Sequence, residues 1–291
     1  ITELETPAVL LDLDIAEKNL QTYQQACDKY KKSLWPMVKT HKSSSLLKKQ
    51  MELGAEGFLC GTIDECEMAV EAGAGKIMYA YPPANPKNIS RLAVLAHKAD
   101  IIIRIDHLDV ARMLETAAEK EGITFFYSII VDMDFHRFGV APAKVVAFAQ
   151  EMKQFSHLKF FGISTHPGQV YGCTTQEERQ TVAKLETETM GSVAADLKAA
   201  GFTDFFVTSG STPTFALTVD QPEIQIYHPG NYIYHDAIQI ALGSATEADC
   251  SLSVLATIIS HPSEDVYLCD AGAKCLGLDQ GAHGSAAVTG F

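Results

Sequence analysis

The chain has 291 residues, of which 47% are hydrophobic and 20% charged, a composition typical of a globular protein large enough for one sizeable core. Its formal net charge of −13 argues against nucleic acid and against anionic membrane surfaces as partners. No apolar run is long enough to span a bilayer, and the first residues show no signal-peptide pattern.

The seven cysteines are scattered along the sequence and form no Cys-x-x-Cys pair. This usage is typical of a reducing compartment and argues against both a disulfide framework and a zinc ribbon. We therefore expect a cytoplasmic protein. Because the chain begins at Ile1 and stops at Phe291 without a helix end or a polar tail, we also expect it to be a fragment of a longer polypeptide.

Short apolar runs alternate with longer helix-like segments, which predicts a parallel sheet with crossover helices. The first run is 8–13, after which Asp14 and Glu17 predict a capping box that opens a helix to about residue 30. Eight further strands are predicted at 34–40, 57–62, 76–81, 100–105, 124–131, 158–165, 204–209 and 223–227. Helices are predicted at 44–53, 63–72, 85–97, 108–121, 143–155 and 175–200, with one or two helical turns at 213–219.

Eight strands separated by helices favour a closed (β/α)₈ or TIM barrel over an open, doubly wound α/β sheet. No Gly-x-Gly-x-x-Gly follows any early strand. After residue 235 the runs 250–259, 265–269 and 286–288 have no helix-length gaps between them, which predicts the start of a β domain. We expect residues 1–33 to lead into the barrel, 34–235 to form it, and 236–291 to begin a β domain that also takes the N-terminal strand.

The sequence WPMVKTHKS at 35–43 places Lys39 where an apolar run gives way to polar residues. A lysine at the carboxyl edge of a barrel strand, partly desolvated, can act as an amine nucleophile towards a carbonyl group. Most lysines are simply solvated at the surface, so the other motifs decide between these interpretations.

Two loops after the last barrel strands have the composition of anion-binding sites. SGSTPT at 209–214 combines glycine, hydroxyl groups and a proline suited to a first helical turn, which predicts free backbone N–H groups for a phosphate. HPGNY at 228–232 contains a glycine that lets the backbone approach a ligand closely. A plain helix cap and a plain turn are the alternatives.

Three more side chains are predicted at the same mouth of the barrel. Arg137 follows the fifth strand and can pair with a phenolate or a carboxylate. His166 and Tyr171 follow the sixth strand. A lysine, a phosphate cradle and an arginine together suggest pyridoxal phosphate, and the alternative for the same parts is a Schiff-base aldolase acting on a phosphorylated sugar.

A family resemblance favours the cofactor. TPAVLLDLD at 6–14 and VKTHKS at 38–43 resemble the opening of the D-threonine aldolase and D-serine dehydratase-like family, which are pyridoxal phosphate enzymes with an alanine racemase-like, fold type III barrel. HRFGV at 136–140, SGSTPT at 209–214, PGNY at 229–232 and DAGAK at 270–274 are similar to further motifs of that family, in the family's order.

The resemblance implies roles for individual residues. Lys39 matches the lysine that binds the cofactor, Arg137 an arginine near its ring oxygen, and Tyr171 a tyrosine near its pyridine nitrogen. A histidine that precedes this tyrosine in the family is replaced by Gln169, which puts substrate contacts there in doubt. The predicted catalytic residues are Lys39, Arg137 and His166. The predicted cofactor-binding residues are Lys39, Arg137, Tyr171, Ser209, Gly210, Ser211, Thr212, Gly230, Asn231 and Tyr232.

The family also implies a divalent metal, bound by a His-x-Cys or His-x-Asp pair near the C-terminus. His107-Leu108-Asp109 lies in the barrel and does not match, and His283 is followed by glycine and serine. We therefore name no metal ligand in this chain and expect such a site only beyond Phe291. The resemblance further implies a homodimer and a small-molecule D-amino acid substrate.

The predicted function is that of a pyridoxal phosphate-dependent lyase acting on a β-hydroxy D-amino acid, most similar to D-threonine aldolase. A deaminating lyase of the D-serine dehydratase type uses the same residues, so the sequence does not separate the two reactions. An amino-acid racemase and a non-catalytic pyridoxal phosphate carrier are the remaining alternatives.

Overall fold

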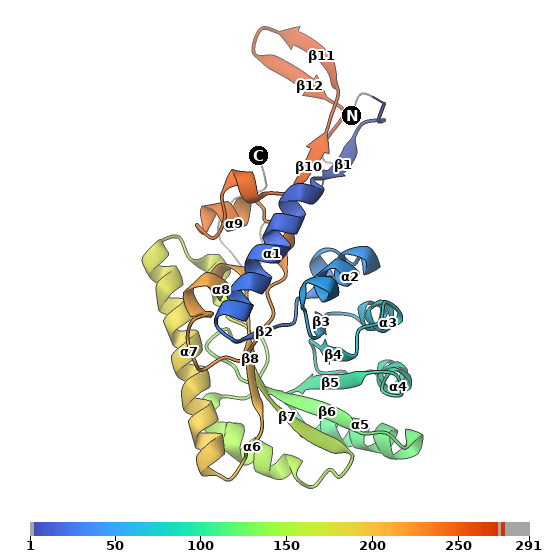
Figure 1. The fold of residues 1–291 in the computed structure, drawn as a ribbon, viewed down its shortest axis with the longest axis vertical. Coiled ribbons are helices and arrows are strands. Elements are labelled where there is room, and N and C mark those ends of the chain that lie inside the picture. The colour runs from blue at the N-terminus through green and yellow to red at the C-terminus, as the bar shows by residue number, and fades with distance from the viewer. Residues whose placement is uncertain (1–2, 273–274, 277–291) are drawn as a thin grey trace.

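The computed structural model describes residues 3–272 and 275–276 and contains an eight-stranded parallel barrel (Figure 1). Its strands are β2 (Ser33–Leu34), β3 (Phe58–Cys60), β4 (Lys76–Tyr79), β5 (Asp100–Ile105), β6 (Phe125–Ile130), β7 (Leu158–Ser164), β8 (Phe206–Ser209) and β9 (Ile226–Tyr227). They follow the order β2-β9-β8-β7-β6-β5-β4-β3, and a bridge between Met37 and Leu59 joins the two ends. The predicted (β/α)₈ barrel is confirmed.

The helices surround the barrel, with the long helix α7 along one side (Figure 1). They are α2 (Ser44–Leu53), α3 (Ile63–Glu71), α4 (Pro86–Leu95), α5 (Leu108–Glu121), α6 (Val145–Met152), α7 (Gln176–Ala199) and α8 (Thr212–Thr218). Side chains that accept backbone N–H groups fix several of their starts, as Ser43 does for α2 and Thr175 for α7. Among the described helices, none combines the length and apolarity needed to cross a membrane.

The barrel strands separate two apolar clusters, because successive side chains of a strand point to opposite faces. Trp35, Met37 and Ile102 belong to the smaller cluster inside the barrel. Ile101 and Ile103 belong to the larger cluster between the barrel and the helices. The alternation along β5 therefore decides which side chains face the barrel interior.

The N-terminal strand and the residues after the barrel form a separate antiparallel unit. β1 (Ala8–Leu11) pairs with β10 (Leu252–Leu255), and β11 (Ile258–Ser263) forms a hairpin with β12 (Val266–Cys269) that extends away from the barrel (Figure 1). The N-terminal strand thus joins the C-terminal strands, as predicted. The strand expected at 286–288 lies outside the described residues, and the domain boundaries at 33 and 235 stay predictions.

Helix α1 (Leu13–Lys29) begins two residues earlier than the sequence predicted. Asp12 is its N-cap and accepts the N–H of Ile15 at 3.0 Å, so the capping box assigned to Asp14 and Glu17 is wrong. The physical reason is that Asp12 already has extended backbone geometry at the end of β1, which leaves Asp14 inside the first turn.

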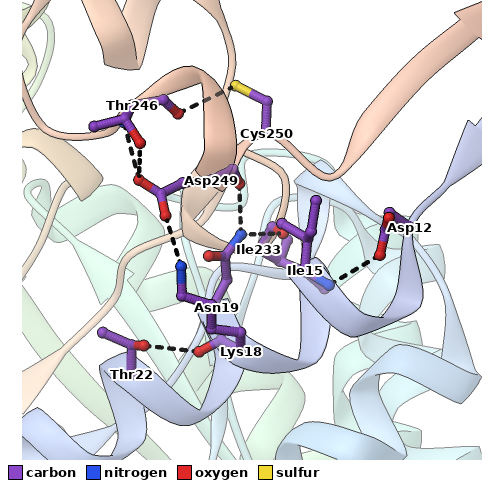
Figure 2. A network of polar contacts seen from close by, with 9 residues as sticks. All are labelled: Asp12, Ile15, Lys18, Asn19, Thr22, Ile233, Thr246, Asp249 and Cys250. Atoms are coloured by element: carbon purple, nitrogen blue, oxygen red, sulfur yellow. Dashed lines mark hydrogen bonds and ion pairs between the residues drawn. The ribbon is translucent and has the colours of Figure 1, made fainter.

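Helix α1 is tied to the segment that follows the barrel by a polar network (Figure 2). Asn19 donates to the carbonyls of Ile233 at 3.2 Å and Asp249 at 2.8 Å, and Lys18 forms an ion pair with the Asp249 carboxylate at 3.2 Å. Thr246 donates to the same carboxylate from its backbone and its hydroxyl group. This network holds the chain just after the predicted 228–232 loop against α1.

Candidate active site

A cavity opens at the carboxyl ends of the barrel strands. Nine of the predicted site residues line it, namely Lys39, Arg137, His166, Tyr171, Gly210, Ser211, Thr212, Gly230 and Asn231. Residues from six separate segments of the sequence are therefore brought to one place.

Lys39 lies on a single 3₁₀ turn, η1 (Val38–Thr40), rather than at the end of a continuous strand. Strand β2 ends at Leu34, since Pro36 has no N–H for a sheet, although its carbonyl still accepts the N–H of Leu59 at 2.9 Å. The turn sets Lys39 at the cavity with an exposed side chain. The partial desolvation predicted for this lysine is not seen.

Gly210 brings the loop after β8 against the loop after β9. Its φ of +154° is rare for any residue with a side chain, and a Cβ atom there would lie 2.5 Å from the backbone nitrogen of His228. The N–H of His228 donates to the carbonyl of Ser209 at 2.9 Å. The glycine is therefore required by the barrel itself, in addition to lining the cavity.

The hydroxyl-rich residues after Gly210 are linked to each other and to the next loop. Ser211 caps α8, and its Oγ lies 3.0 Å from Oγ1 of Thr214. Oγ1 of Thr212 accepts the backbone N–H of Asn231 at 3.1 Å. Gly230 packs closely, since a Cβ there would meet Met37 and Thr40 at 3.1 Å. The two predicted anion-binding loops thus form one continuous wall.

Two predicted cofactor-binding residues do not line the cavity. Ser209 is completely buried, and its hydroxyl group donates to Oε1 of Glu186 on α7 at 2.5 Å. Tyr232 is also buried, accepts a hydrogen bond from Gln50 at 2.8 Å and packs against the ring of Tyr23. Their side chains belong to the core behind the cavity wall, which sequence adjacency to the loop residues could not reveal.

The segment around Arg137 places its guanidinium between two aromatic rings. The guanidinium carbon lies 4.9 Å from the ring centre of Phe135 and 4.6 Å from that of Phe138, distances suited to cation–π contact. His136 has a φ of +52°, and Asp132 accepts its backbone N–H at 3.0 Å. These contacts hold Arg137 at the mouth of the cavity.

His166 follows β7, and its Nδ1 donates to the carbonyl of Gly210 at 3.1 Å. Burial is the main reason that its pKa is lowered to about 3, and the nearby cations Arg137 and Lys39 add to the effect. At neutral pH the imidazole is therefore uncharged, with Nδ1 carrying the proton. Such a group supports a ligand by contact and hydrogen bonding and cannot serve as a ready acid.

Tyr171 lies on the 3₁₀ turn η3 (Gly168–Gly172) beside the segment after the barrel. Burial raises the pKa of its phenol to about 12, Asp236 adds to this, and a hydrogen bond with Gln239 opposes it. Gln239 belongs to α9 (Ala237–Ala241), a helix that the sequence did not predict. Gln169 turns away, and its amide donates to the carbonyl of Met133 at 2.9 Å.

Several cavity residues were missed by sequence reasoning, notably Tyr81, Arg104 and His228. His228 was noted only as part of a turn, yet it is buried, and Nδ1 bonds the carbonyl of Trp35 at 2.8 Å. Arg104 directly follows the three isoleucines 101–103 of β5, which was a usable signal. None of the described residues lining the cavity is Asp or Glu, so its charge is positive.

This positive cavity fits pyridoxal phosphate. It offers the amine of Lys39, a glycine at which the backbone reaches the surface, hydroxyl groups at 211 and 212, and an arginine for an oxyanion.

The described residues do not form a metal site. Among residues 3–272 and 275–276, no group of three or more His, Cys, Asp or Glu side chains could hold one. The metal site expected beyond Phe291 stays a prediction.

The fold and the site together define the class: a (β/α)₈ barrel enzyme with an amine and two linked, hydroxyl-rich loops at the mouth of the barrel. Comparison with known proteins identifies the family. Residues 11–237 match the family "Alanine racemase, N-terminal domain", and residues 251–290 match a serine dehydratase domain family. The chain belongs to the alanine racemase N-terminal domain family.

Its relatives are named as lyases. D-threo-3-hydroxyaspartate dehydratase of Delftia sp. (strain HT23) is 30% identical, over 96% of this chain and 74% of the relative. D-threonine aldolase of Arthrobacter sp. is 28% identical, over 94% and 73%. The crystal structure of D-threonine aldolase from Filomicrobium marinum superposes with a TM-score of 0.90 at 27% identity, covering 97% of this chain and 77% of that one.

These findings confirm the predicted family, fold and enzyme class, which is that of the pyridoxal phosphate-dependent lyases. The roles of individual residues, the homodimer and the cytoplasmic location stay predictions.

Proposed function

We propose that this chain cleaves β-hydroxy D-amino acids in the manner of a D-threonine aldolase, giving glycine and an aldehyde. The observation that carries the proposal is that Lys39 faces the same cavity as the linked loops 210–212 and 230–231. The names of the relatives support a D-amino acid with a β-hydroxyl group as the substrate.

The residues present suggest how a cofactor is held. Backbone N–H groups and hydroxyls of Gly210, Ser211 and Thr212 bind its phosphate, and Gly230 and Asn231 close that site from the other loop. Arg137 pairs with the oxygen of its ring, and Lys39 holds it covalently through the amine. When bound, pyridoxal phosphate supplies an electron sink for the bond broken at Cα.

The same residues suggest how the chain acts on the substrate. With the cofactor bound, the amine of Lys39, once released by the incoming substrate, would lie near Cα and would carry a proton to or from that atom. In the aldolase reaction a base would take the proton of the β-hydroxyl group, the Cα–Cβ bond would break to release the aldehyde, and a proton from Lys39 to Cα would complete glycine. The neutral imidazole of His166 positions the ligand and keeps the site from carrying a further positive charge.

A second reaction has specific support, because the relative that is 30% identical is named a dehydratase. There Lys39 would take the α-proton, the β-hydroxyl group would leave as water, and hydrolysis of the resulting enamine would give an oxo acid and ammonia. Products separate the two reactions. D-threonine gives glycine and acetaldehyde in the first, and 2-oxobutanoate and ammonia in the second.

The test begins with purified protein loaded with pyridoxal phosphate. We expect visible absorbance, reduction by borohydride that fixes the cofactor on Lys39, and turnover of D-threonine but not L-threonine. Lys39→Ala should lose all three. Assays with and without added divalent metal ions guard against a missing activator. If the loaded protein yields neither product pair, the lyase proposal fails, and a racemase or a carrier remains.

A further inference from the structure

A buried guanidinium faces the cavity from inside the barrel. Arg104 is the penultimate residue of β5, and its side chain lies on the same face as Ile102 of the inner cluster. Only 3% of the residue is exposed. Its Nε donates to Oγ of Ser164 on β7 at 2.9 Å, so the side chain reaches across the barrel interior below the mouth. Arg104 thus forms part of the cavity floor.

No carboxylate in the described part of the chain forms an ion pair with Arg104, although Asp106 acts favourably on its charge. Its Nη2 is buried and has no hydrogen-bond acceptor there, and Nε2 of His228, which also lines the cavity, is a buried acceptor without a donor among the same residues. Burial, with a smaller contribution from Arg137, lowers the pKa of Arg104 to about 10, while Tyr81 and Asp106 oppose the shift. A buried cation is costly unless an acceptor or an anion meets it, and no carboxylate lines this cavity.

We infer that Arg104 is a further cofactor-binding residue, which donates from the floor of the cavity to an acceptor atom of the pyridoxal phosphate ring. This inference rests on the proposed function. A cofactor held by Lys39 and the 210–212 loop would occupy the cavity that Arg104 also lines, and an acceptor of its ring would meet the unpaired Nη2 there.

The test compares four proteins: wild type, Arg104→Met, Arg104→Gln and the control Ser128→Ala. Ser128 is paired with Arg104 in the sheet, is fully buried, and does not line the cavity. Each protein is depleted of cofactor and titrated with pyridoxal phosphate, and its visible spectrum and unfolding temperature are recorded before and after loading. The Lys39 adduct is checked by borohydride reduction.

We expect Arg104→Met to weaken cofactor binding by about tenfold to a hundredfold, as for loss of a charge-assisted hydrogen bond. Its visible spectrum should shift, and loading should raise its unfolding temperature less than that of wild type. Arg104→Gln keeps a hydrogen-bond donor without the charge, and its cofactor affinity should lie between those of wild type and Arg104→Met. Ser128→Ala should behave as wild type. The Lys39 adduct should form in all four proteins.

Several results would overturn the inference. Unchanged cofactor affinity and an unchanged spectrum in a folded Arg104 variant would show that the guanidinium serves folding alone. If the variant unfolds below wild type by the same number of degrees before and after cofactor loading, the guanidinium likewise serves folding alone. If affinity is unchanged but KM for the D-amino acid rises, Arg104 binds the substrate carboxylate instead. Where Arg104→Met does not fold, Arg104→Gln decides by the same readings. Failure of wild type to bind the cofactor would instead refute the proposed function.

Discussion

The hydroxyl group of Thr212 accepts the backbone N–H of Asn231 at 3.1 Å, and this contact joins the loop after β8 to the loop after β9. Both residues line the cavity, and Thr212 is only 2% exposed. Thr212 and Asn231 are 19 residues apart in the sequence. A change in one of them is therefore expected to alter the other.

Thr212→Val keeps the shape of the side chain and removes the acceptor. The N–H of Asn231 then lacks its partner, which we expect to lower the free energy of unfolding by about 1–2 kcal/mol. Because the phosphate site spans both loops, affinity for pyridoxal phosphate should fall about tenfold. Denaturant unfolding and cofactor titration measure the two effects. Thr218→Val, in the same helix but away from the cavity, should leave the affinity unchanged. Wild-type affinity in Thr212→Val would refute the link.

Gly210→Ala tests a different property of the same wall. The backbone contact with His228 predicts that a substitution at 210 disturbs folding as well as cofactor binding, because any Cβ atom there meets main chain. We expect Gly210→Ala to lower the free energy of unfolding by about 2 kcal/mol or more, measured by denaturant titration. Gly75→Ala, where a Cβ would meet nothing, is the control. Equal stabilities would contradict this.

The strands and helices were largely predictable because the sequence patterns are local. The run at 100–105 contains four isoleucines, which are β-branched and apolar, and β5 has those bounds. The strand predicted at 34–40 is shorter, since Pro36 interrupts the N–H ladder and a turn follows. Helix α9 was missed because it is five residues long and its pattern is too short to detect.

Most site residues that belong to sequence motifs were predicted correctly as lining the cavity. The prediction failed for residues whose place is decided by tertiary contacts. Lys39, Arg137 and the 210–212 loop lie in segments that follow barrel strands in the sequence, so their convergence follows from the barrel. Ser209 is adjacent to that loop, but strand alternation and α7 turn it towards Glu186. Glu186 itself looks like any acidic residue of a long helix. No sequence pattern shows that this one position is buried against β8.

Glu186 gives the last prediction, which concerns pH. Burial raises the pKa of its carboxyl group to about 7, against an ordinary value of 4.5, while hydrogen bonds from Ser209 and Thr214 oppose the shift. A carboxyl group with a raised pKa in the folded state supports stability fully below pH 4.5, and that support is lost as the pH rises through 7. The difference between the two pKa values corresponds to about 3 kcal/mol of unfolding free energy.

Glu186→Gln removes the titration and keeps an acceptor for Ser209. Relative to wild type, the variant should therefore gain stability between pH 5 and 8 by up to about 3 kcal/mol in denaturant unfolding. Glu188→Gln, exposed on the same helix, should follow wild type. Parallel curves for wild type and Glu186→Gln across this range would show that Glu186 is already ionised in the folded protein.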